Sequence, residues 1–231
     1  DSSLKFRLKN DLDLGSEPNF YIPYLAGEFN GNGYKITNLK LNIDVVAQVG
    51  LFGYLASGGK LSEVGVENVN VTATNSREAG GLVGGNSGTV KDSYSTGTVT
   101  GDYFVGGLVG QCLGGDETSV RDSHSTGNVN GDKHIGGLVG QSKCIVSNSY
   151  STGQVTGDFI VGGLVGDSGT LVSSSCSTGT VTGNWVVGGL VAESSGTVSN
   201  SYSTSDVIGE TSDVAGLVGH NVGNVENSYS K

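Results

Sequence analysis

The sequence predicts an all-β fold, a parallel β-helix (β-solenoid) of about 26-residue coils with an atypical N-terminal coil. The first observation behind it is that Gly-Gly-Leu-Val-Gly recurs at spacings of 26 to 31 residues. The second is that 41 of 231 residues are Gly, without the Gly-X-Y period of collagen. The third is that valines and serines return at fixed places between the glycine motifs. Units of this size cannot bury an apolar face alone, so several must stack.

The leucine of each glycine motif is the expected core anchor. Burying such a side chain is worth roughly 1.5 to 3 kcal/mol before entropy is counted, so several coils are needed for net stability. The anchors are Leu82, Leu108, Leu138, Leu164 and Leu190, with degenerate copies at Leu51 and Leu217.

The N-terminal segment, residues 1–45, departs from the repeat and is predicted to be a capping coil. Within it, residues 29–39 combine a Gly-rich turn with alternating Ile and Leu, which indicates a turn followed by a strand. The repeats occupy residues 46–231, and we expect residues 1–231 to form a single solenoid domain. The last repeat stops in mid-coil at Lys231, so we expect a longer protein of which this chain is a fragment.

Alternation along residues 93–100 sorts the side chains of one coil into two faces. Ser93, Ser95 and their equivalents are small in every copy, so they are expected to point inward. The residues between them vary among polar types, which indicates solvent. The outward face would carry a Tyr column and three Thr-rich ranks.

Two corners are predicted in each coil. Position 92 holds Asp, Asn or Ser in all copies, and these residues tolerate the left-handed backbone conformation of a turn. A second corner follows Gly101 and its equivalents, where Asp102, Asp132 and Asp158 stand in a column. Either these carboxylates extend into water while capping the turn, or a calcium ion relieves the repulsion between them.

A four-residue insertion lies between Gln111 and Ser119, and it marks a loop that projects from one face. Cys112 and Cys144 flank this region on successive coils, and whether they pair stays open at this point. The third cysteine, Cys176, takes a place in the Tyr column.

The formal net charge of −10 disfavours nucleic acid and anionic membrane surfaces as partners. No apolar run approaches the 18 residues of a membrane span, so membrane insertion is not expected. The chain contains no H-E-x-x-H and no G-x-S-x-G, which excludes the corresponding metalloprotease and esterase sites.

The glycine motif, followed by Val-x-Asn-Ser-Tyr-Ser-Thr-Gly-x-Val-Thr-Gly and clearest over residues 146–157, resembles the GLUG motif. The resemblance covers nearly the whole chain. It implies a β-solenoid of adhesin-like bacterial or archaeal surface and secreted proteins, including immunoglobulin A protease relatives, in which the repeats are not the catalytic part. Departures from the motif are Ala192, His124, Cys176 and the insertion, which we assign to surface and loop columns.

Three functions are therefore weighed. The leading hypothesis is a non-catalytic extracellular or cell-surface module with a stalk or adhesion role, which binds a glycan or protein and needs no cofactor other than, potentially, calcium. The alternative is an ice-binding solenoid that uses the outward Thr ranks, and the third is a polysaccharide-processing enzyme. The candidate binding face comprises Tyr94, Thr96, Thr98, Thr100, Thr126, Tyr150, Thr152, Thr156, Thr178, Thr180, Thr182, Tyr202 and Thr204.

Overall fold

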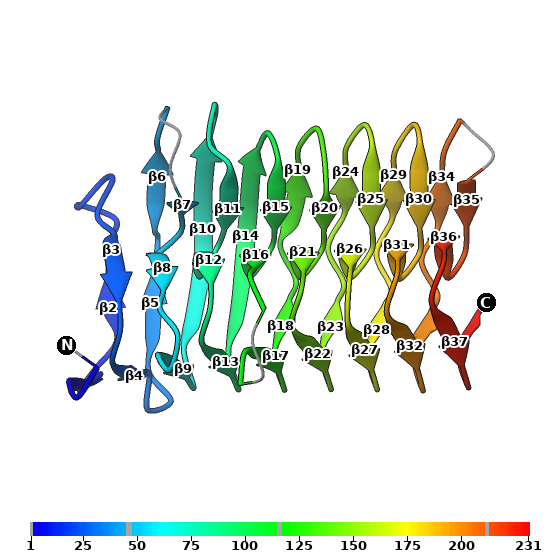
Figure 1. Cartoon of the computed structure of the whole chain (residues 1–231). Helices are drawn as coiled ribbons and strands as arrows, with labels where there is room; N and C mark the ends of the chain where they lie inside the picture. Colours follow the sequence, from blue (N-terminus) through cyan, green and yellow to red (C-terminus); the bar gives the residue numbers. More distant parts are fainter. Residues whose placement is uncertain (1, 45–47, 115–116, 211–212) are drawn as a thin grey trace.

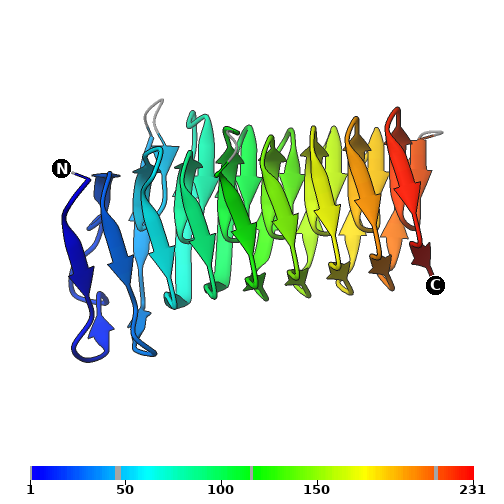
Figure 2. The same cartoon turned by 60° about the horizontal axis from the view of Figure 1, so that its bottom comes forward.

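The chain forms a stack of coils, and its two termini lie at opposite ends of the molecule (Figure 1). A computed structural model describes residues 2–44, 48–114, 117–210 and 213–231. These residues form a β-solenoid of about eight turns, roughly 27 residues apart. The described part of the chain contains no helix long and apolar enough to cross a membrane. The predicted fold class is confirmed, and Figure 2 shows the same stack from below.

Four sheets run along the stack, and the strand pairs within them are parallel. The base sheet comprises β1 (Lys5–Arg7), β4 (Glu28–Asn30), β9 (Lys60–Ser62), β13 (Thr89–Lys91), β17 (Ser119–Arg121), β22 (Ile145–Ser147), β27 (Leu171–Ser173), β32 (Thr197–Ser199) and β37 (Asn224–Glu226). The serine sheet comprises β2 (Leu12–Asp13), β5 (Lys35–Thr37), β6 (Lys40–Asn42), β10 (Gly65–Ala73), β14 (Tyr94–Gly101), β18 (His124–Ser125), β19 (Asn128–Asn130), β23 (Tyr150–Ser151), β24 (Val155–Thr156), β28 (Cys176–Ser177), β29 (Val181–Thr182), β33 (Tyr202–Ser203), β34 (Val207–Ile208) and β38 (Tyr229–Ser230).

The other two sheets stand on either side of each glycine motif. The first bend sheet comprises β7 (Gln48–Val49), β11 (Glu78–Gly80), β15 (Phe104–Gly106), β20 (Ile135–Gly136), β25 (Ile160–Gly162), β30 (Val186–Gly188) and β35 (Asp213–Ala215). The second bend sheet comprises β3 (Ile22–Leu25), β8 (Phe52–Leu55), β12 (Val83–Asn86), β16 (Val109–Cys112), β21 (Val139–Ser142), β26 (Val165–Ser168), β31 (Val191–Ser194) and β36 (Val218–Asn221).

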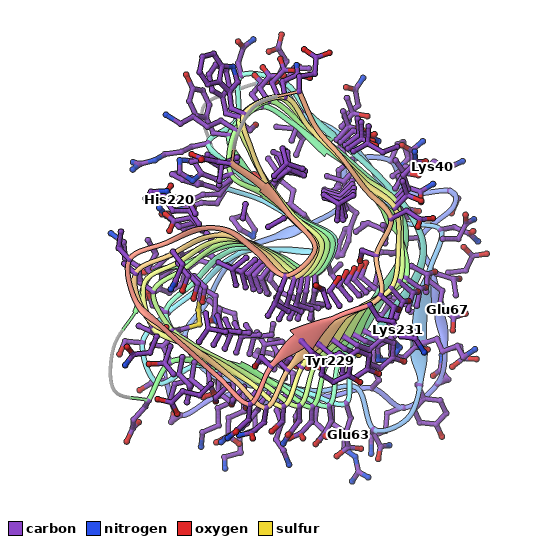
Figure 3. All side chains as sticks on the ribbon, turned by 90° about the vertical axis from the view of Figure 1, so that its right-hand side faces the viewer. Lys40, Glu63, Glu67, His220, Tyr229 and Lys231 are labelled. Carbon is purple, nitrogen blue, oxygen red and sulfur yellow. A yellow bond between two sulfur atoms is a disulfide. The ribbon has the colours of Figure 1, made fainter. Side chains whose placement is uncertain are left out.

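The glycine motif folds the chain inward between the two bend sheets. Seen along the axis, the ribbon of each coil bends deeply inward at this motif, and we call the outer side of this bend the recess (Figure 3). The anchor Leu138 is fully buried, as are Leu108 and Leu164 in the coils on either side. The predicted role of these leucines is confirmed, because they form the middle of the apolar core.

The second glycine of each pair is required because the bend touches the far wall of its own coil. A Cβ atom on Gly137 would lie 2.2 Å from Oγ of Ser151, and one on Gly163 would lie 2.3 Å from Oγ of Ser177. No side chain fits at such a distance. The inward serines are buried as predicted, and they are small because the glycine backbone occupies the space in front of them.

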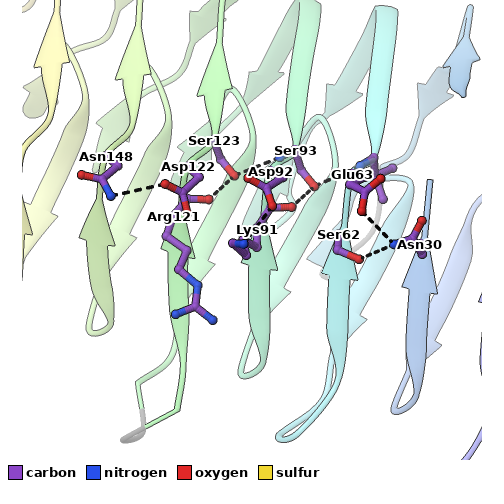
Figure 4. A network of polar contacts seen from close by, with 11 residues as sticks. Asn30, Ser62, Glu63, Lys91, Asp92, Ser93, Arg121, Asp122, Ser123 and Asn148 are labelled. Carbon is purple, nitrogen blue, oxygen red and sulfur yellow. Dashed lines mark hydrogen bonds and ion pairs between the residues drawn. The ribbon is translucent and has the colours of Figure 1, made fainter. Parts of the chain in front are cut away.

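The first corner has the backbone conformation that the sequence predicted. Asp92 has a φ of 49°, and Asp122 and Asn148 have φ values of 52° and 49°. Beside this corner, the Ser93 hydroxyl donates to the carbonyl of Lys91 at 2.7 Å, and the backbone N–H of Ser93 donates to Oγ of Ser123 at 3.1 Å (Figure 4). The same contacts recur along the column, so a chain of hydroxyls satisfies the backbone groups that the turn removes from the sheet.

One departure from the repeat lies in a place that the sequence analysis misassigned. Ala192 replaces the closing Gly of its motif, and it is fully buried in β31 and not in a surface or loop column. This position packs against the preceding coil: a Cβ atom on the equivalent Gly166 would lie 2.5 Å from the carbonyl oxygen of Gly140. The other substituted columns, at His124 and Cys176, do lie on the partly exposed outward side.

Cys112 and Cys144 form a disulfide, which settles the pairing that the sequence left open. Cys112 aligns with Ser142 of the next coil, and Cys144 follows two residues after Ser142. The bond therefore joins two successive coils beside the insertion. Residues 115–116, at the centre of that insertion, lie outside the described residues.

The N-terminal coil is atypical, as expected. Its first strand, β1, pairs with β4, and its residues are exposed. Leu4, Phe6 and Tyr24 also lie exposed at this end of the stack. The Gly-rich segment after β4 forms a turn that inserts extra residues before β5.

Removing the disulfide should destabilise the stack. The bond closes a loop with a sequence separation of 32, for which the chain-entropy account gives roughly 3 to 4 kcal/mol. We expect the double variant Cys112→Ser/Cys144→Ser to lose about that much free energy of unfolding in urea, followed by circular dichroism. Cys176→Ser is the matched control and should change little. An equal loss in the control, or none in the double variant, would contradict the prediction.

Candidate binding surface

The predicted binding face lies on the outer side of the serine sheet, where its side chains are partly or fully exposed. The Tyr column forms a ladder of stacked rings. Tyr94 and His124 have centroids 5.0 Å apart with an interplanar angle of 4°, and His124 and Tyr150 are 4.6 Å apart at 5°. Cys176 interrupts the ladder, which resumes with Tyr202 and Tyr229 at 5.5 Å.

This stacking determines what the Tyr column can offer to a ligand. Rings at such distances cover each other's faces, so the ladder presents ring edges and hydroxyl groups to solvent. The Tyr94 hydroxyl donates to the Glu67 carboxylate at 2.7 Å. A platform for sugar rings would need an open ring face, which the inner members of the ladder lack.

The outward Thr residues also stand in ranks, but the strand beneath them is interrupted. The rank of Thr126, Thr152, Thr178 and Thr204 is exposed, and none of these residues belongs to a strand. Each coil from His124 onward splits its serine-sheet strand at this Thr. The surface is therefore bent along each coil at the position where a flat array would have to run.

The Asp residues of the second corner form hydrogen bonds within and between the turns. The Asp102 carboxylate accepts from the backbone N–H of Asn75 at 2.6 Å, and the Asp158 carboxylate accepts from the Asn184 side chain at 3.0 Å. Asp132 stands between them, and its backbone N–H donates to the carbonyl of Asp102. Across the described ranges, no three His, Cys, Asp or Glu side chains are grouped so that they could hold a metal ion.

The recess behind the glycine bend holds a row of polar side chains that the sequence analysis did not identify. Gln111 donates to the Gln141 side chain at 2.5 Å, and Gln141 donates to the Asp167 carboxylate at 2.7 Å. His134, on the opposite wall, has Nδ1 at 3.8 Å from Asp167. Burial lowers the pKa of His134, against the opposing effect of Asp167, so this histidine is mainly neutral near pH 7.

Glu78 lies deepest among the acids of this recess, and only 4% of its surface is exposed. Its carboxylate occupies the space above Gly85, where a Cβ atom would lie 2.6 Å from Oε2. This oxygen is buried and has no hydrogen-bond partner among the residues that the structure describes. Burial raises the pKa of the Glu78 carboxyl above its ordinary value of 4.5, and it outweighs the lowering effects of a hydrogen bond from Gln48 and the charge of Arg77.

Large exposed aromatic side chains follow the second corner, two residues after its Gly. Tyr103, Phe159 and Trp185 are 55%, 45% and 57% exposed. Phe159 and Trp185 stack with centroids 6.1 Å apart. Backbone hydrogen bonds between successive corners align this row, which we call the corner rank; its members are Arg77, Tyr103, Lys133, Phe159 and Trp185.

A pocket of about 450 Å³ lies at the N-terminal part of the corner rank. Its lining comes from three successive coils: Asn75, Ser76, Arg77, Tyr103, Phe104, Lys133 and His134. The Arg77 guanidinium stands 5.9 Å from the centroid of the Phe104 ring. The ring centroids of Phe104 and His134 are 5.1 Å apart. Because His134 lines both the pocket and the recess, the pocket borders the recess.

The corner rank could have been found by aligning the coils on the corner glycines. Each of Gly101, Gly131, Gly157 and Gly183 is followed two residues later by Tyr, Lys, Phe or Trp.

Comparisons with known proteins agree with the architecture. A family model described as the GLUG motif matches residues 75–100 and 131–156. Halomucin from Haloquadratum walsbyi (strain DSM 16790 / HBSQ001) is 40% identical over 85 residues, which are 37% of this chain and 1% of halomucin. This chain thus spans only a small part of that relative. A Bacteroides ovatus protein with the provisional name immunoglobulin A1 protease has a crystal structure similar over 100% of this chain and 79% of its own, with a TM-score of 0.71 and 20% identity. That likeness concerns the fold.

The buried Glu78 generates a prediction about pH. Because its pKa is raised in the folded state, the native protein loses stability as pH rises from 4.5 through that raised value, and the loss then stays constant. Glu78→Gln avoids this loss. We expect the variant to gain stability over the native protein across that window and to match it below about pH 4, in urea unfolding at several pH values.

Glu67→Gln is the control with the opposite sign. Lys35 and the Tyr94 hydroxyl lower the pKa of Glu67, so its contribution is present above pH 4.5 and is lost as pH falls through the lowered value. This variant should therefore be slightly less stable than the native protein at neutral pH. A Glu78→Gln variant that is destabilised at pH 7 would show that the buried carboxylate is a favourable contact.

Proposed function

We propose that this chain, a β-solenoid of GLUG repeats, is a non-catalytic module of a secreted or surface-bound protein, with a stalk or adhesion role in which it binds a glycan or a protein. The observation that carries the binding role is the corner rank, whose Tyr, Phe and Trp side chains are about half exposed. Exposing aromatic side chains to water is unfavourable in free energy, and such side chains are enriched where a surface binds a partner.

Two observations support an extracellular location of the protein. The Cys112–Cys144 disulfide persists in oxidising surroundings and is unusual in the cytosol. The segment shared with halomucin, a protein named as a mucin, points the same way. A stalk role is supported by the stack itself, because each coil contacts its neighbours and the solenoid extends along one axis (Figure 1).

The arrangement of the acids supports a non-catalytic role. Glycosidases hold two carboxyl groups on either side of a scissile bond. Asp167 and Glu193 are register partners in adjacent coils, so both project from the same wall of the recess. Glu78 lies three coils before Asp167, about 14 Å along the axis at the usual strand spacing, which exceeds the separation of a glycosidase pair.

Binding by the corner rank can be separated from binding by the predicted Tyr and Thr face. The chain is screened against immobilised glycans and surface proteins, and a hit is titrated by calorimetry. We expect Phe159→Ala and Trp185→Ala each to weaken binding about tenfold or more, since exposed aromatic residues are common binding hot spots. Tyr150→Ala is the matched control on the other face.

The opposite pattern, in which Tyr150→Ala removes binding and Trp185→Ala does not, would move the site to the predicted Tyr and Thr face. A screen without any hit would contradict the adhesion role and leave only the stalk.

Ice binding is the alternative from another class, and the unbroken Thr rank favours it. The split strand beneath that rank works against it, because ordered water on a solenoid face requires regular flat spacing. We expect the unmodified chain to show no thermal hysteresis. If hysteresis is measured, and Thr152→Tyr with Thr178→Tyr abolishes it while Tyr103→Ala does not, the ice-binding alternative replaces the adhesion role.

A further inference from the structure

The pocket at the corner rank combines cationic with aromatic side chains. It holds two cations, Arg77 and Lys133, one on each side of Tyr103 along the rank. From residue 144 to residue 230 the sequence contains neither Lys nor Arg. The pocket therefore lies in the half of the stack where a negatively charged ligand meets less repulsion.

Neither cation is neutralised by an ion pair within the part of the chain that the structure describes. The ion pairs there join other residues, such as Lys35 with Glu67 and Lys60 with Glu28. The carboxylate of Asp102, the corner residue before Tyr103, accepts from the backbone N–H of Asn75. Arg77 keeps its guanidinium near the Phe104 ring, which leaves its N–H donors available to a ligand.

The aromatic component of the pocket is accessible. Tyr103 is 55% exposed, and no aromatic ring of the described residues stacks on it. This contrasts with Tyr94, His124 and Tyr150, whose ring faces are covered by one another. Phe104 adds a half-buried apolar wall at the border with the recess.

An aromatic surface between two cations selects a particular ligand chemistry. The C–H groups of a pyranose ring are apolar and pack against an aromatic side chain, whose face is electron-rich. A carboxylate on the sugar forms a paired hydrogen bond with a guanidinium, and a second cation about 10 Å away, two coils along the rank, can meet the next acidic group of the chain. A neutral sugar would leave both cations unused, and an inorganic anion would leave the aromatic surface unused.

We propose that the pocket formed by Arg77, Tyr103, Phe104, Lys133 and His134 binds a carboxylate-bearing sugar of an acidic glycan. This inference rests on the proposed glycan-binding role and specifies its site and ligand class.

The test compares one glycan in two forms. Binding of a uronic-acid oligosaccharide to the full chain is titrated by calorimetry beside its carboxyl-reduced form, which has the same rings without the charge. We expect the reduced form to bind at least tenfold more weakly. Arg77→Gln and Lys133→Gln should each weaken binding of the acidic form about tenfold, and Tyr103→Ala should weaken both forms.

Lys143→Gln is the matched control, because it removes the same charge from an exposed position outside the pocket. Unchanged thermal unfolding of each variant shows that the stack is intact. Equal affinity for the two forms would overturn the acidic ligand class while glycan binding stands. Preference for the acidic form with unchanged affinity in the three pocket variants would overturn the site. Absence of binding to any glycan in the wider screen would instead remove the glycan-binding role on which the inference rests.

Discussion

The structure depends on the close approach of each glycine bend to a serine across the inside of its own coil. A Cβ atom on the second glycine would overlap the serine hydroxyl in coil after coil, at 2.1 Å for both Gly81 with Ser95 and Gly107 with Ser125. This approach brings the anchor leucine to the middle of the coil, where it meets the leucines above and below. The glycines of the motif are thus needed so that the backbone can approach the opposite wall, and this approach places the leucine in the apolar core.

Because that interior is nearly identical in every coil, the outward residues fall into straight ranks. The alignment of outward side chains has different consequences on the serine sheet and on the corner rank. On the serine sheet it brings aromatic rings into contact, and the ladder covers its own faces. On the corner rank Tyr103 lies between Arg77 and Lys133, so no aromatic ring of the described residues stacks on it. The same regular spacing therefore closes one aromatic surface and leaves another open.

The most distinctive chemistry lies where the repeat is broken. The insertion after Cys112 accompanies the disulfide to Cys144, which ties two coils together. Gly85 stands where the following coils carry Gln111, Gln141 and Asp167, and the missing side chain leaves room for the Glu78 carboxylate. A repetitive scaffold can hold such exceptions because the neighbouring coils keep the ladder of backbone hydrogen bonds intact.

The sequence by itself determined the solenoid, the leucine anchors, the inward serines and the left-handed corner at position 92. These features recur in every coil and depend on the local backbone conformation, so each copy of the repeat supports the same prediction. Only the tertiary structure decided the recess, the burial of Glu78, the disulfide, the contact between ring faces and the pocket at Arg77, Tyr103 and Lys133. The buried position of Ala192 was likewise misassigned from the sequence. Each of these depends on the distance between residues in different coils or across the inward bend. That distance is set by how the chain folds back on itself, which a repeat period does not contain.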